Sequence, residues 1–532
     1  MSDLPAGSAE GGAAPPPIRL PAHPWIVAIS VLAATFMEVL DTTVVNVSLP
    51  HIAGNLSASN EEATWTLTSY LVANAIVLPM TGWLASRVGR RRLLLGSIIG
   101  FTATSLVCGL STSLAQLVVA RILQGLTGGT LQPISQSVML ESFPPEKRGR
   151  AMGFWALGIV VAPMLGPILG GWLTDRWSWH WVFFINVPIG LAAWAMIRAN
   201  VQDPPYLVRH TAPVDGWGLG LLVVGIGSLQ FVLDKGQQED WFESRLILTL
   251  AVLAAAALVA LVVRELRSAN PILDLRVFRL RTFSVGVFLM TCLGMVLYGS
   301  IMLLPLMLQT LLGYSSYDAG VAVAPRGLGS FLAMPVIGLL VGRFDARKML
   351  VGGLVTGAFT LFWLARMNLS AGYWDWFWPQ FIMGISLGLL FVPLTTLTMH
   401  SIPLRQMGHA TSLFNLMRNI GGSAGIALSA TLVSRQQQGL IGHLGGNVTA
   451  YDPASRSFLE GATALFRGQG IDAQTAARAA ELAAFGRVAR QASLLAFLET
   501  FRVLGAIFLL VVPLVALMRR ARPGAAGPSA PH

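Results

Sequence analysis

The sequence of 532 residues has few charged residues for its length, and this shortage excludes most soluble architectures. Only 11% of its residues are Asp, Glu, Lys or Arg, whereas ordinary globular domains carry about 25%. Hydrophobic residues make up 54% of the chain and the mean hydropathy is +0.64. One or two water-soluble cores could not enclose so much apolar surface, so the composition predicts a membrane protein.

Lysine and cysteine are also scarce, and each shortage argues against a class of protein. Lys147, Lys235 and Lys348 are the only lysines, and none lies in a Gly-Lys-Ser/Thr sequence. A P-loop ATPase is therefore disfavoured, because its phosphate loop needs that lysine. Cys108 and Cys292 both lie inside apolar runs. They are expected to pack in a core, and no disulfide framework can form from them.

Nucleic-acid binding and enzymatic activity are disfavoured by the context of the remaining signals. The net charge of +11 comes from short basic clusters between apolar runs, which is not the pattern of a nucleic-acid surface. The run Gly421–Gly425 matches the Gly-x-Ser-x-Gly pattern of a hydrolase nucleophile elbow, but it lies in an apolar stretch that is predicted to be helical. That elbow requires a strand, a turn and a helix. We expect no enzyme, no catalytic residues and no metal site.

Long apolar runs occupy most of the chain. A membrane helix needs about 20 mostly apolar residues, and runs of about this length recur throughout the sequence. They predict an all-α polytopic membrane protein with 14 transmembrane helices. The predicted spans lie near 25–47, 64–86, 93–110, 114–137, 151–173, 181–199, 215–233, 245–263, 283–308, 319–342, 349–365, 377–399, 409–433 and 497–518.

Basic residues are concentrated in every second loop, and this pattern predicts the orientation of the chain in the membrane. If residue 1 is cytoplasmic, the inside loops hold most of the arginines, and the positive-inside rule then places both termini in the cytoplasm. The short outside loops offer little beyond Arg176, Lys235, Arg245 and Arg366. The inside loops hold Arg87, Arg90, Arg91, Arg92, Lys147, Arg148, Arg150, Arg264, Arg267, Arg276, Arg279, Arg281, Arg343, Arg347, Lys348, Arg519, Arg520 and Arg522.

Three segments fall outside the predicted spans. Residues 1–24 are rich in Pro, Gly and Ala and are expected to form a disordered cytoplasmic tail, and residues 519–532 form a second cytoplasmic tail. Residues 435–496 form an insert on the outer, periplasmic side. Within it, Asp472 is a candidate N-cap for an amphipathic helix that we expect to lie on the outer face or on a partner.

A weak internal repeat predicts two bundles of helices. The run Gly82–Arg92 after the second span is similar to the run Gly338–Lys348 after the tenth. These runs come into register only if two six-helix bundles are separated by two extra helices. The predicted domains are an N-terminal bundle at 25–200, two inserted linker helices at 213–264, and a C-terminal bundle at 282–518 that includes the insert.

Two acids interrupt the first apolar run. Placing an acid in hydrocarbon costs about 2.5–3.5 kcal/mol, so Glu38 and Asp41 indicate proton or ion handling. At about 1.5 Å per residue, Asp41 and Arg121 lie about 9 and 10 Å from the outer ends of their helices and can meet at one depth. Glu38 lies on the same helix face as Asp41. We expect one acid to alternate between pairing with Arg121 and protonation in an apolar wall. A buried ion pair that fixes helix register is the alternative.

Five sequence runs, which follow one another along the chain, together resemble the motifs of a known family. This family is the fourteen-span drug:proton antiporters of the major facilitator superfamily, of EmrB/QacA type. The EmrB-like multidrug exporters are the most similar members. Ser86 stands where many members carry Asp, which departs from the charged part of the loop motif. The runs are Leu40–Pro50 for the first helix, Gly82–Arg92 for the loop motif, Arg121–Gly125 for the fourth helix, Gly158–Gly171 for the antiporter motif of the fifth helix, and Phe183–Gly190 for this branch.

The candidate site residues fall into four groups. Proton coupling is assigned to Asp41, Glu38 and Arg121. The glycine spacing and the prolines of the fifth helix fit either close packing or a rocking hinge, and the arginines of the loop motif fit either a cytoplasmic gate or plain topology. The substrate cavity is assigned to Asn46, Gln124, Gln132, Arg326, Asn415 and Arg418, the gate to Gly82, Arg87, Gly89, Arg90 and Arg91, and the antiporter helix to Gly158, Pro163, Gly166, Pro167, Gly170 and Gly171.

The resemblance implies proton-coupled efflux of bulky hydrophobic compounds, such as weak acids, uncouplers and antibiotics, by alternating access in the cell inner membrane. The proton is the implied coupling ion, with no other cofactor, and membrane lipid surrounds the helices. Docking of the insert on a periplasmic membrane-fusion adaptor that leads to an outer-membrane channel is also implied, and a surface lid is the other interpretation. The functional alternatives are an exporter of one endogenous metabolite or of lipophilic cations, and a non-transporting receptor or passive channel.

Overall fold

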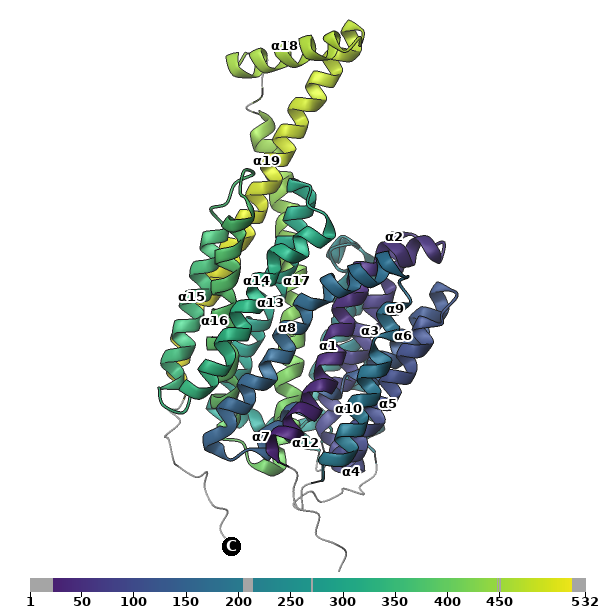
Figure 1. Cartoon of the computed structure of the whole chain (residues 1–532), viewed down its shortest axis with the longest axis vertical. Coiled ribbons are helices and arrows are strands. Elements are labelled where there is room, and N and C mark those ends of the chain that lie inside the picture. The colour runs from purple at the N-terminus through teal and green to yellow at the C-terminus, as the bar shows by residue number, and fades with distance from the viewer. Residues whose placement is uncertain (1–22, 204–213, 269–270, 447, 449–450, 519–532) are drawn as a thin grey trace, which may run out of the picture.

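The computed structural model describes residues 23–203, 214–268, 271–446, 448 and 451–518, and the regular structure in these residues is entirely helical. Most helices run side by side along the long axis of the molecule, and α18 (Pro453–Gly468) stands well apart from them at one end (Figure 1). The predicted all-α fold is confirmed. The predicted cytoplasmic tails lie outside the described residues, apart from His23 and Pro24 at the start of the first helix.

The first bundle contains six crossing segments, three of which consist of more than one helix. In this bundle the first segment packs most closely against the fifth, and the third segment packs against the fourth and the sixth. The six segments are α1 (Pro24–Asn55), α2 (Asn60–Ala63) with α3 (Trp65–Val77), η1 (Leu78–Met80) and α4 (Thr81–Val88), α5 (Arg90–Gly109), α6 (Leu114–Gly128) with α7 (Leu131–Ser142), α8 (Arg148–Arg176), and α9 (Trp181–Phe184) with α10 (Asn186–Asn200).

The remaining helices form the inserted pair and the second bundle. Short 3-10 helices connect or end several of them, namely η3 (Trp241–Glu243), η4 (Leu275–Arg279), η5 (Leu404–Gln406) and η6 (Val512–Leu517), and η2 (Pro145–Lys147) precedes α8 in the first bundle. The inserted pair is α11 (Gly216–Lys235) and α12 (Arg245–Arg267), and the second bundle contains α13 (Arg281–Leu312), α14 (Ser316–Leu340), α15 (Ala346–Leu364), α16 (Tyr373–His400), α17 (Met407–Gly446) and α19 (Ala473–Leu510).

Fourteen crossing segments result, in agreement with the sequence. Eleven helical segments of the described residues are long and apolar enough to cross a membrane. The segment made of α6 and α7, together with α15 and α17, fall short of that criterion and complete the count of fourteen. Helix boundaries differ from the predicted spans by several residues, because helices such as α1 and α13 continue beyond the apolar run.

Glycines in and directly after α6 let this helix approach α3 closely. A Cβ atom on Gly125 would lie 2.5 Å from the carbonyl oxygen of Tyr70, and one on Gly129 would lie 2.6 Å from that of Asn74. Neither contact is compatible with a side chain, so glycine is required at both positions. This close packing brings Tyr70 and Asn74 of α3 toward the acids of α1.

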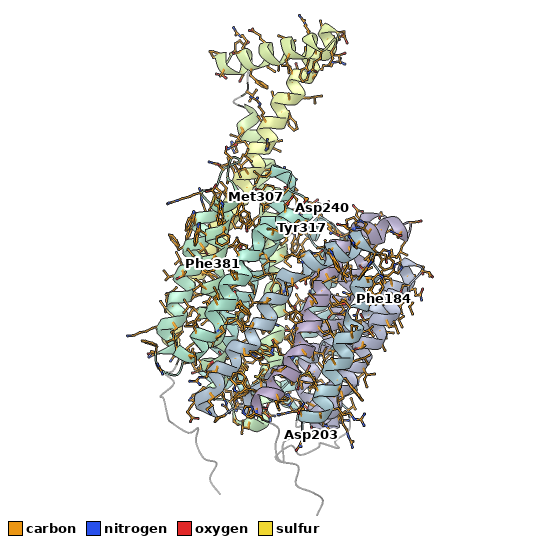
Figure 2. All side chains as sticks on the ribbon, in the orientation of Figure 1. Phe184, Asp203, Asp240, Met307, Tyr317 and Phe381 are labelled. Carbon is orange, nitrogen blue, oxygen red and sulfur yellow. The ribbon has the colours of Figure 1, made fainter. Side chains whose placement is uncertain are left out.

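The two ends of the bundle differ in sequence and can be told apart without reference to a membrane. We call the end where α1 begins and α5 begins the Arg-rich end, since it carries Arg90 and Arg91. Asp203 lies at this end, whereas Asp240 and Tyr317 lie toward the opposite end (Figure 2). We call the opposite end the hairpin end, because α18 and the first part of α19 project from it (Figure 1).

The structure corrects the prediction of a loop at Gly82–Arg92. Residues Thr81–Val88 form α4 and residues from Arg90 onward form α5, so Gly89 alone departs from helical geometry, with φ of 94°. A positive φ is readily adopted only by glycine, and this single residue makes the turn. The arginines of the motif therefore project from helix ends.

The amphipathic helix of the insert, which we expected on the outer face or on a partner, does not lie on the outer face. Asp472 caps it as predicted, accepting hydrogen bonds from the amides of Gln474 and Thr475. The helix then continues without a break to Leu510 as part of the last crossing segment. Because it is continuous with a membrane helix, it points away from the bundle, where it packs against α18 (Figure 1).

Candidate functional site

Asp41 and Arg121 form an ion pair inside the first bundle. Asp41 lies in the middle of α1 and Arg121 in the middle of α6, and both side chains are fully buried. The Arg121 Nη1 atom lies 2.6 Å from Asp41 Oδ2. The two residues thus lie at one depth, as the helix rise predicts. Their role in proton coupling stays a prediction.

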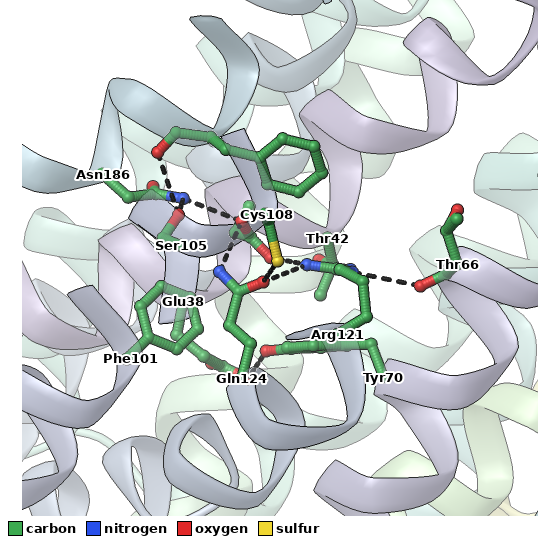
Figure 3. Close-up of polar contacts among 12 residues, drawn as sticks. Glu38, Thr42, Thr66, Tyr70, Phe101, Ser105, Cys108, Arg121, Gln124 and Asn186 are labelled. Atoms are coloured by element: carbon green, nitrogen blue, oxygen red, sulfur yellow. Dashed lines mark hydrogen bonds and ion pairs between the residues drawn. The ribbon is translucent and has the colours of Figure 1, made fainter. Parts of the chain in front are cut away.

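Two amides complete the surroundings of the Asp41 carboxylate. Gln124 Nε2 donates to Asp41 Oδ1 at 3.1 Å, and Asn186 Nδ2 donates to the same oxygen at 2.7 Å (Figure 3). Gln124 Oε1 also accepts from Arg121 at 2.7 Å, and Asn186 donates to Ser105 at 3.0 Å. The carboxylate of Asp41 thus accepts hydrogen bonds from one guanidinium and two amides.

Arg121 is held by contacts besides the ion pair. Its Nε donates to the carbonyl oxygen of Thr66 at 3.0 Å, and its guanidinium carbon lies 4.2 Å from the centre of the Tyr70 ring (Figure 3). A cation over an aromatic face is stabilised by the ring quadrupole, more strongly when water is excluded. The charge of Arg121 is therefore compensated by Asp41 and by neighbouring groups of α3.

Glu38 lies one helical turn from Asp41, and its hydrogen-bond donors are uncharged. Its carboxylate accepts from Tyr70 Oη at 3.4 Å, Asn74 Nδ2 at 3.1 Å and Gln132 Nε2 at 2.5 Å. No ion pair of Glu38 is found in the described residues. The two acids on α1 thus occupy different environments, one beside a guanidinium and the other among neutral donors.

Polar contacts beside Glu38 join the first bundle to the second. Arg418 of α17 donates through Nη2 to Gln132 Oε1 of α7. One helical turn away on each helix, Asn415 Nδ2 donates to Gln136 Oε1 at 2.5 Å. Gln132, Asn415 and Arg418, three of the predicted cavity residues, therefore meet at the interface between the bundles.

The other predicted cavity residues do not meet there. Gln124 belongs to the buried Asp41–Arg121 cluster. Arg326 is fully buried inside the second bundle, where it donates to Gln380 Oε1 at 2.8 Å and to Ser300 Oγ at 3.2 Å. Asn46 lies exposed on α1, nearer the hairpin end than Asp41. The six residues assigned to one cavity thus occupy four different places.

The predicted gate residues lie at the Arg-rich end, where the two bundles touch. The amide of Gly82 donates to Ser412 Oγ of α17 at 3.1 Å. A Cβ atom on Gly82 would lie 2.7 Å from the backbone nitrogen of His409, so the backbones of α4 and α17 are in close contact. Nearby, α8 meets α14 through Gly149 and Gly338, where an added Cβ would lie 2.9–3.1 Å from the facing backbone.

The arginines of the gate motif contact the first bundle itself. Arg90 pairs with Glu141 of α7, and the amide of Arg91 donates to Asp203 at 2.8 Å. Arg87 lies over the ring of Trp83, 4.8 Å from its centre. These contacts tie the start of α5 to neighbouring segments, while the contact between bundles is made by the glycine of the motif.

The glycine row of α8 packs against α1. A Cβ on Gly158 would meet the side chain of Leu32, one on Gly166 the side chain of Thr43, and one on Gly170 the carbonyl oxygen of Val44 at 2.8 Å. Gly171 has no neighbour within 4 Å of such an atom. Pro163 and Pro167 lie inside the helix, and Pro167 faces Gly320 of α14. Close packing thus accounts for three of the four glycines, and a hinge at the prolines stays a prediction.

Sequence reasoning missed several members of this site. Tyr70, Asn74 and Asn186 contact the two acids, and Gln136 joins the bundles. Each is an isolated polar residue in an apolar segment, which is a usable signal, because polar side chains in membrane helices need partners. No group of three or more His, Cys, Asp or Glu residues in the described ranges could hold a metal ion.

The sequence is similar to membrane transport proteins over most of its length. The sequence model of the Major Facilitator Superfamily matches residues 31–426. The chain is 42% identical over 439 residues to the multidrug export protein EmrB of Haemophilus influenzae, covering 81% of this chain and 85% of that protein. It is 43% identical over 424 residues to the fatty acid resistance protein FarB of Neisseria gonorrhoeae, covering 79% and 83%.

The fold is also similar to that of a solved structure. The crystal structure of the human organic anion transporter MFSD10 (TETRAN) superposes with a TM-score of 0.61 and covers 92% of this chain and 99% of its own. The two sequences are 12% identical, so this likeness concerns the fold alone.

Proposed function

Because this chain belongs to the Major Facilitator Superfamily and groups with its EmrB-type members, we propose that it is a proton-coupled exporter of bulky hydrophobic compounds. Relatives named multidrug export protein EmrB in two species and FarB, named for fatty acid resistance, support this class of substrate. No cofactor besides the coupling proton is required by this proposal.

The single observation that carries the proposal is the pair of acids buried in the middle of α1. Glu38 and Asp41 are 3% and 1% exposed, and Arg121 is fully buried beside them. Placing an acidic side chain in the middle of a membrane has a high free-energy cost, so acids found there usually mark proton or ion pathways. In the proposed cycle, one acid takes up a proton when it faces the side of high proton concentration and releases it when it faces the other side.

Alternating access is the proposed means by which those acids change sides. In the structure the bundles are in backbone contact at the Arg-rich end, at Gly82 with α17 and at Gly149 with Gly338. These contacts support a gate that must separate in the opposite state. Pro163 and Pro167 remove two backbone donors from α8 and favour a bend there during the movement.

We place the Arg-rich end in the cytoplasm and the protein in the inner membrane. Arg87, Arg90 and Arg91 lie at this end, and short loops rich in arginine stay on the cytoplasmic side. Both termini are then cytoplasmic, and the hairpin end is periplasmic. Labelling of single cysteines introduced at Arg92 and at Leu465 from the two sides of the membrane tests this orientation.

The interface between the bundles is the proposed substrate cavity. Gln132, Asn415 and Arg418 bring two amides and one guanidinium to it. A cation beside amides suits lipophilic weak acids, whose apolar part is held by the surrounding helices. Asn46, which is exposed on α1, would contact the substrate as it leaves the cavity. Arg326 is buried inside the second bundle and would influence the cavity without contacting the substrate.

The hairpin formed by α18 and residues 473–490 of α19 is the proposed docking site for a periplasmic membrane-fusion adaptor that leads to an outer-membrane channel. Leu465, Leu482 and Phe485 are 62%, 70% and 57% exposed on it. Apolar side chains exposed on a projecting hairpin favour a protein partner. Co-purification of an adaptor with the full chain, and its loss on removing residues 453–490, tests this assignment.

Uptake into proteoliposomes tests the proposed function. The purified protein should accumulate a lipophilic weak acid only when a pH gradient is imposed, because export is coupled to proton entry. Flux that does not depend on the gradient would indicate a passive channel. Binding without any flux would indicate a receptor.

A further inference from the structure

We propose that Gln132 is a positioning residue that couples the protonation of Glu38 to the contact between the two bundles. The inference rests on the proposed function and assigns a step within it. Gln132 lies near the start of α7, partly buried at the interface. Its amide contacts an acid of the first bundle and a cation of the second.

The two ends of the Gln132 amide are used in opposite senses. Nε2 donates to Glu38 Oε2 at 2.5 Å, and Oε1 accepts from Arg418 Nη2. The amide dipole is thus aligned between a carboxylate and a guanidinium that do not touch each other directly. Both hydrogen bonds are charge-assisted while Glu38 is ionised, and such bonds are about twice as strong as neutral ones.

Protonation of Glu38 removes the charge from one end of this chain. A neutral carboxyl group is a weaker acceptor for Gln132 Nε2, so the amide is less firmly oriented and less polarised toward Arg418. The link between α7 and α17 is then weakened at this level. Loading a proton on Glu38 therefore favours separation of the bundles, and losing the proton favours their contact.

Few other charges act on Glu38. The groups that face it are Asp41 on its own helix, Tyr70 on α3 and Arg418 on α17. α8 and α10 pack against α1, but their charged residues lie in their terminal turns, away from the middle of the membrane. α7 contributes the uncharged Gln132. Arg418 is thus the cation of the second bundle whose hydrogen bond to Gln132 changes in strength with the charge on Glu38.

Gln136 provides a matched control. It lies one turn from Gln132 on α7 and makes the same kind of contact with α17, through Asn415 at 2.5 Å. Among the described residues, Gln136 makes no hydrogen bond to Glu38, Asp41 or another acid. Removing either glutamine side chain deletes one amide contact between the bundles, but only Gln132→Ala also disconnects an acid.

The test compares the pH dependence of transport by Gln132→Ala, Gln136→Ala and the wild-type protein in proteoliposomes. Gln132→Ala removes a donor from ionised Glu38, so the midpoint of its pH profile should shift upward by about one pH unit. It should also allow protons to enter without substrate. Gln136→Ala should lower the rate without moving the midpoint.

Equal profiles for the two variants would overturn the inference, while gradient-driven transport by the wild-type protein would leave the proposed function standing. Absence of gradient-driven transport in the wild-type protein would instead overturn the proposed function. Gln132→Glu serves as a second variant, because it keeps an acceptor for Arg418 and places a carboxylate beside Glu38. The inference predicts that its midpoint moves upward as well, since two facing acids share a proton.

Discussion

Among the described residues, each bundle buries one arginine completely, yet only the arginine of the first bundle has a carboxylate beside it. Arg121 pairs with Asp41 and is further held by Gln124 and by the carbonyl oxygen of Thr66. Arg326 donates to Gln380 and Ser300, and no ion pair of Arg326 is found in the described residues. The first site is charge-compensated, and the second is a cation among neutral groups.

Under the proposed function, this difference favours the first bundle as the place where the proton is bound. A carboxylate beside a guanidinium can change protonation when the pair is separated, because its two environments favour different forms. Amides and hydroxyls do not titrate near neutral pH. The groups around Arg326 therefore stay uncharged during transport and exchange no proton. We therefore expect the first bundle to carry the coupling ion and the second to respond to it through the interface.

The largest effect is expected from the same substitution made in each bundle. Arg121→Gln leaves Asp41 buried without its cation, which should lower the free energy of unfolding by about 3–5 kcal/mol and abolish coupled transport. Arg326→Gln strands no carboxylate but leaves the amide oxygen of Gln380 without its donor, so it should lower the free energy of unfolding by a smaller amount, about 1–3 kcal/mol. Thermal unfolding in detergent measures both. Equal destabilisation by the two variants would break the comparison.

A double substitution sharpens this contrast. Asp41→Asn with Arg121→Gln removes both charges of the pair, so stability should recover most of what Arg121→Gln alone loses. Coupled transport should remain absent, because no acid is left at that position. If the double variant transports with full coupling, Asp41 is a structural residue.

A smaller effect is expected at the gate, where the bundles again differ. A Cβ on Gly82 would lie 2.7–2.9 Å from the backbone of Gly408 and His409, whereas a Cβ on Gly408 would meet only the Gly82 Cα, at 3.5 Å. Gly82→Ala should therefore hold the Arg-rich end apart and lower the transport rate several-fold. Gly408→Ala should be tolerated. Rates in proteoliposomes at equal protein content measure this asymmetry.

The smallest effect is expected at the hairpin, which the first bundle lacks. Hydrogen bonds from Thr475 and Gln474 lower the pKa of Asp472, the N-cap of α19. Its carboxylate therefore stabilises the helix start above its ordinary pKa of 3.8, and this contribution is lost as pH falls below that value. The protection of the amides of Gln474 and Thr475 against hydrogen exchange, relative to their intrinsic exchange rates at each pH, should fall at low pH. Asp472→Asn should abolish that pH dependence.

Sequence reasoning predicted the elements and one contact of the site, and the reasons are local. Apolar run length predicts fourteen spans, and helix rise predicts that Asp41 and Arg121 share a depth. The link from Gln132 to Arg418 was not predictable, because it depends on how two bundles far apart in sequence are placed together. The helical form of the Gly82 motif was missed because its arginines and glycines suggested a loop.

Proton movement driven by substrate in inverted membrane vesicles tests the central claim most directly. Adding a lipophilic weak acid to energised vesicles that contain the wild-type protein should release protons from the vesicle interior, and Asp41→Asn should abolish this signal at equal expression. Glu38→Gln should do the same if Glu38 carries the coupled proton. Normal proton movement and export in both variants would contradict the account.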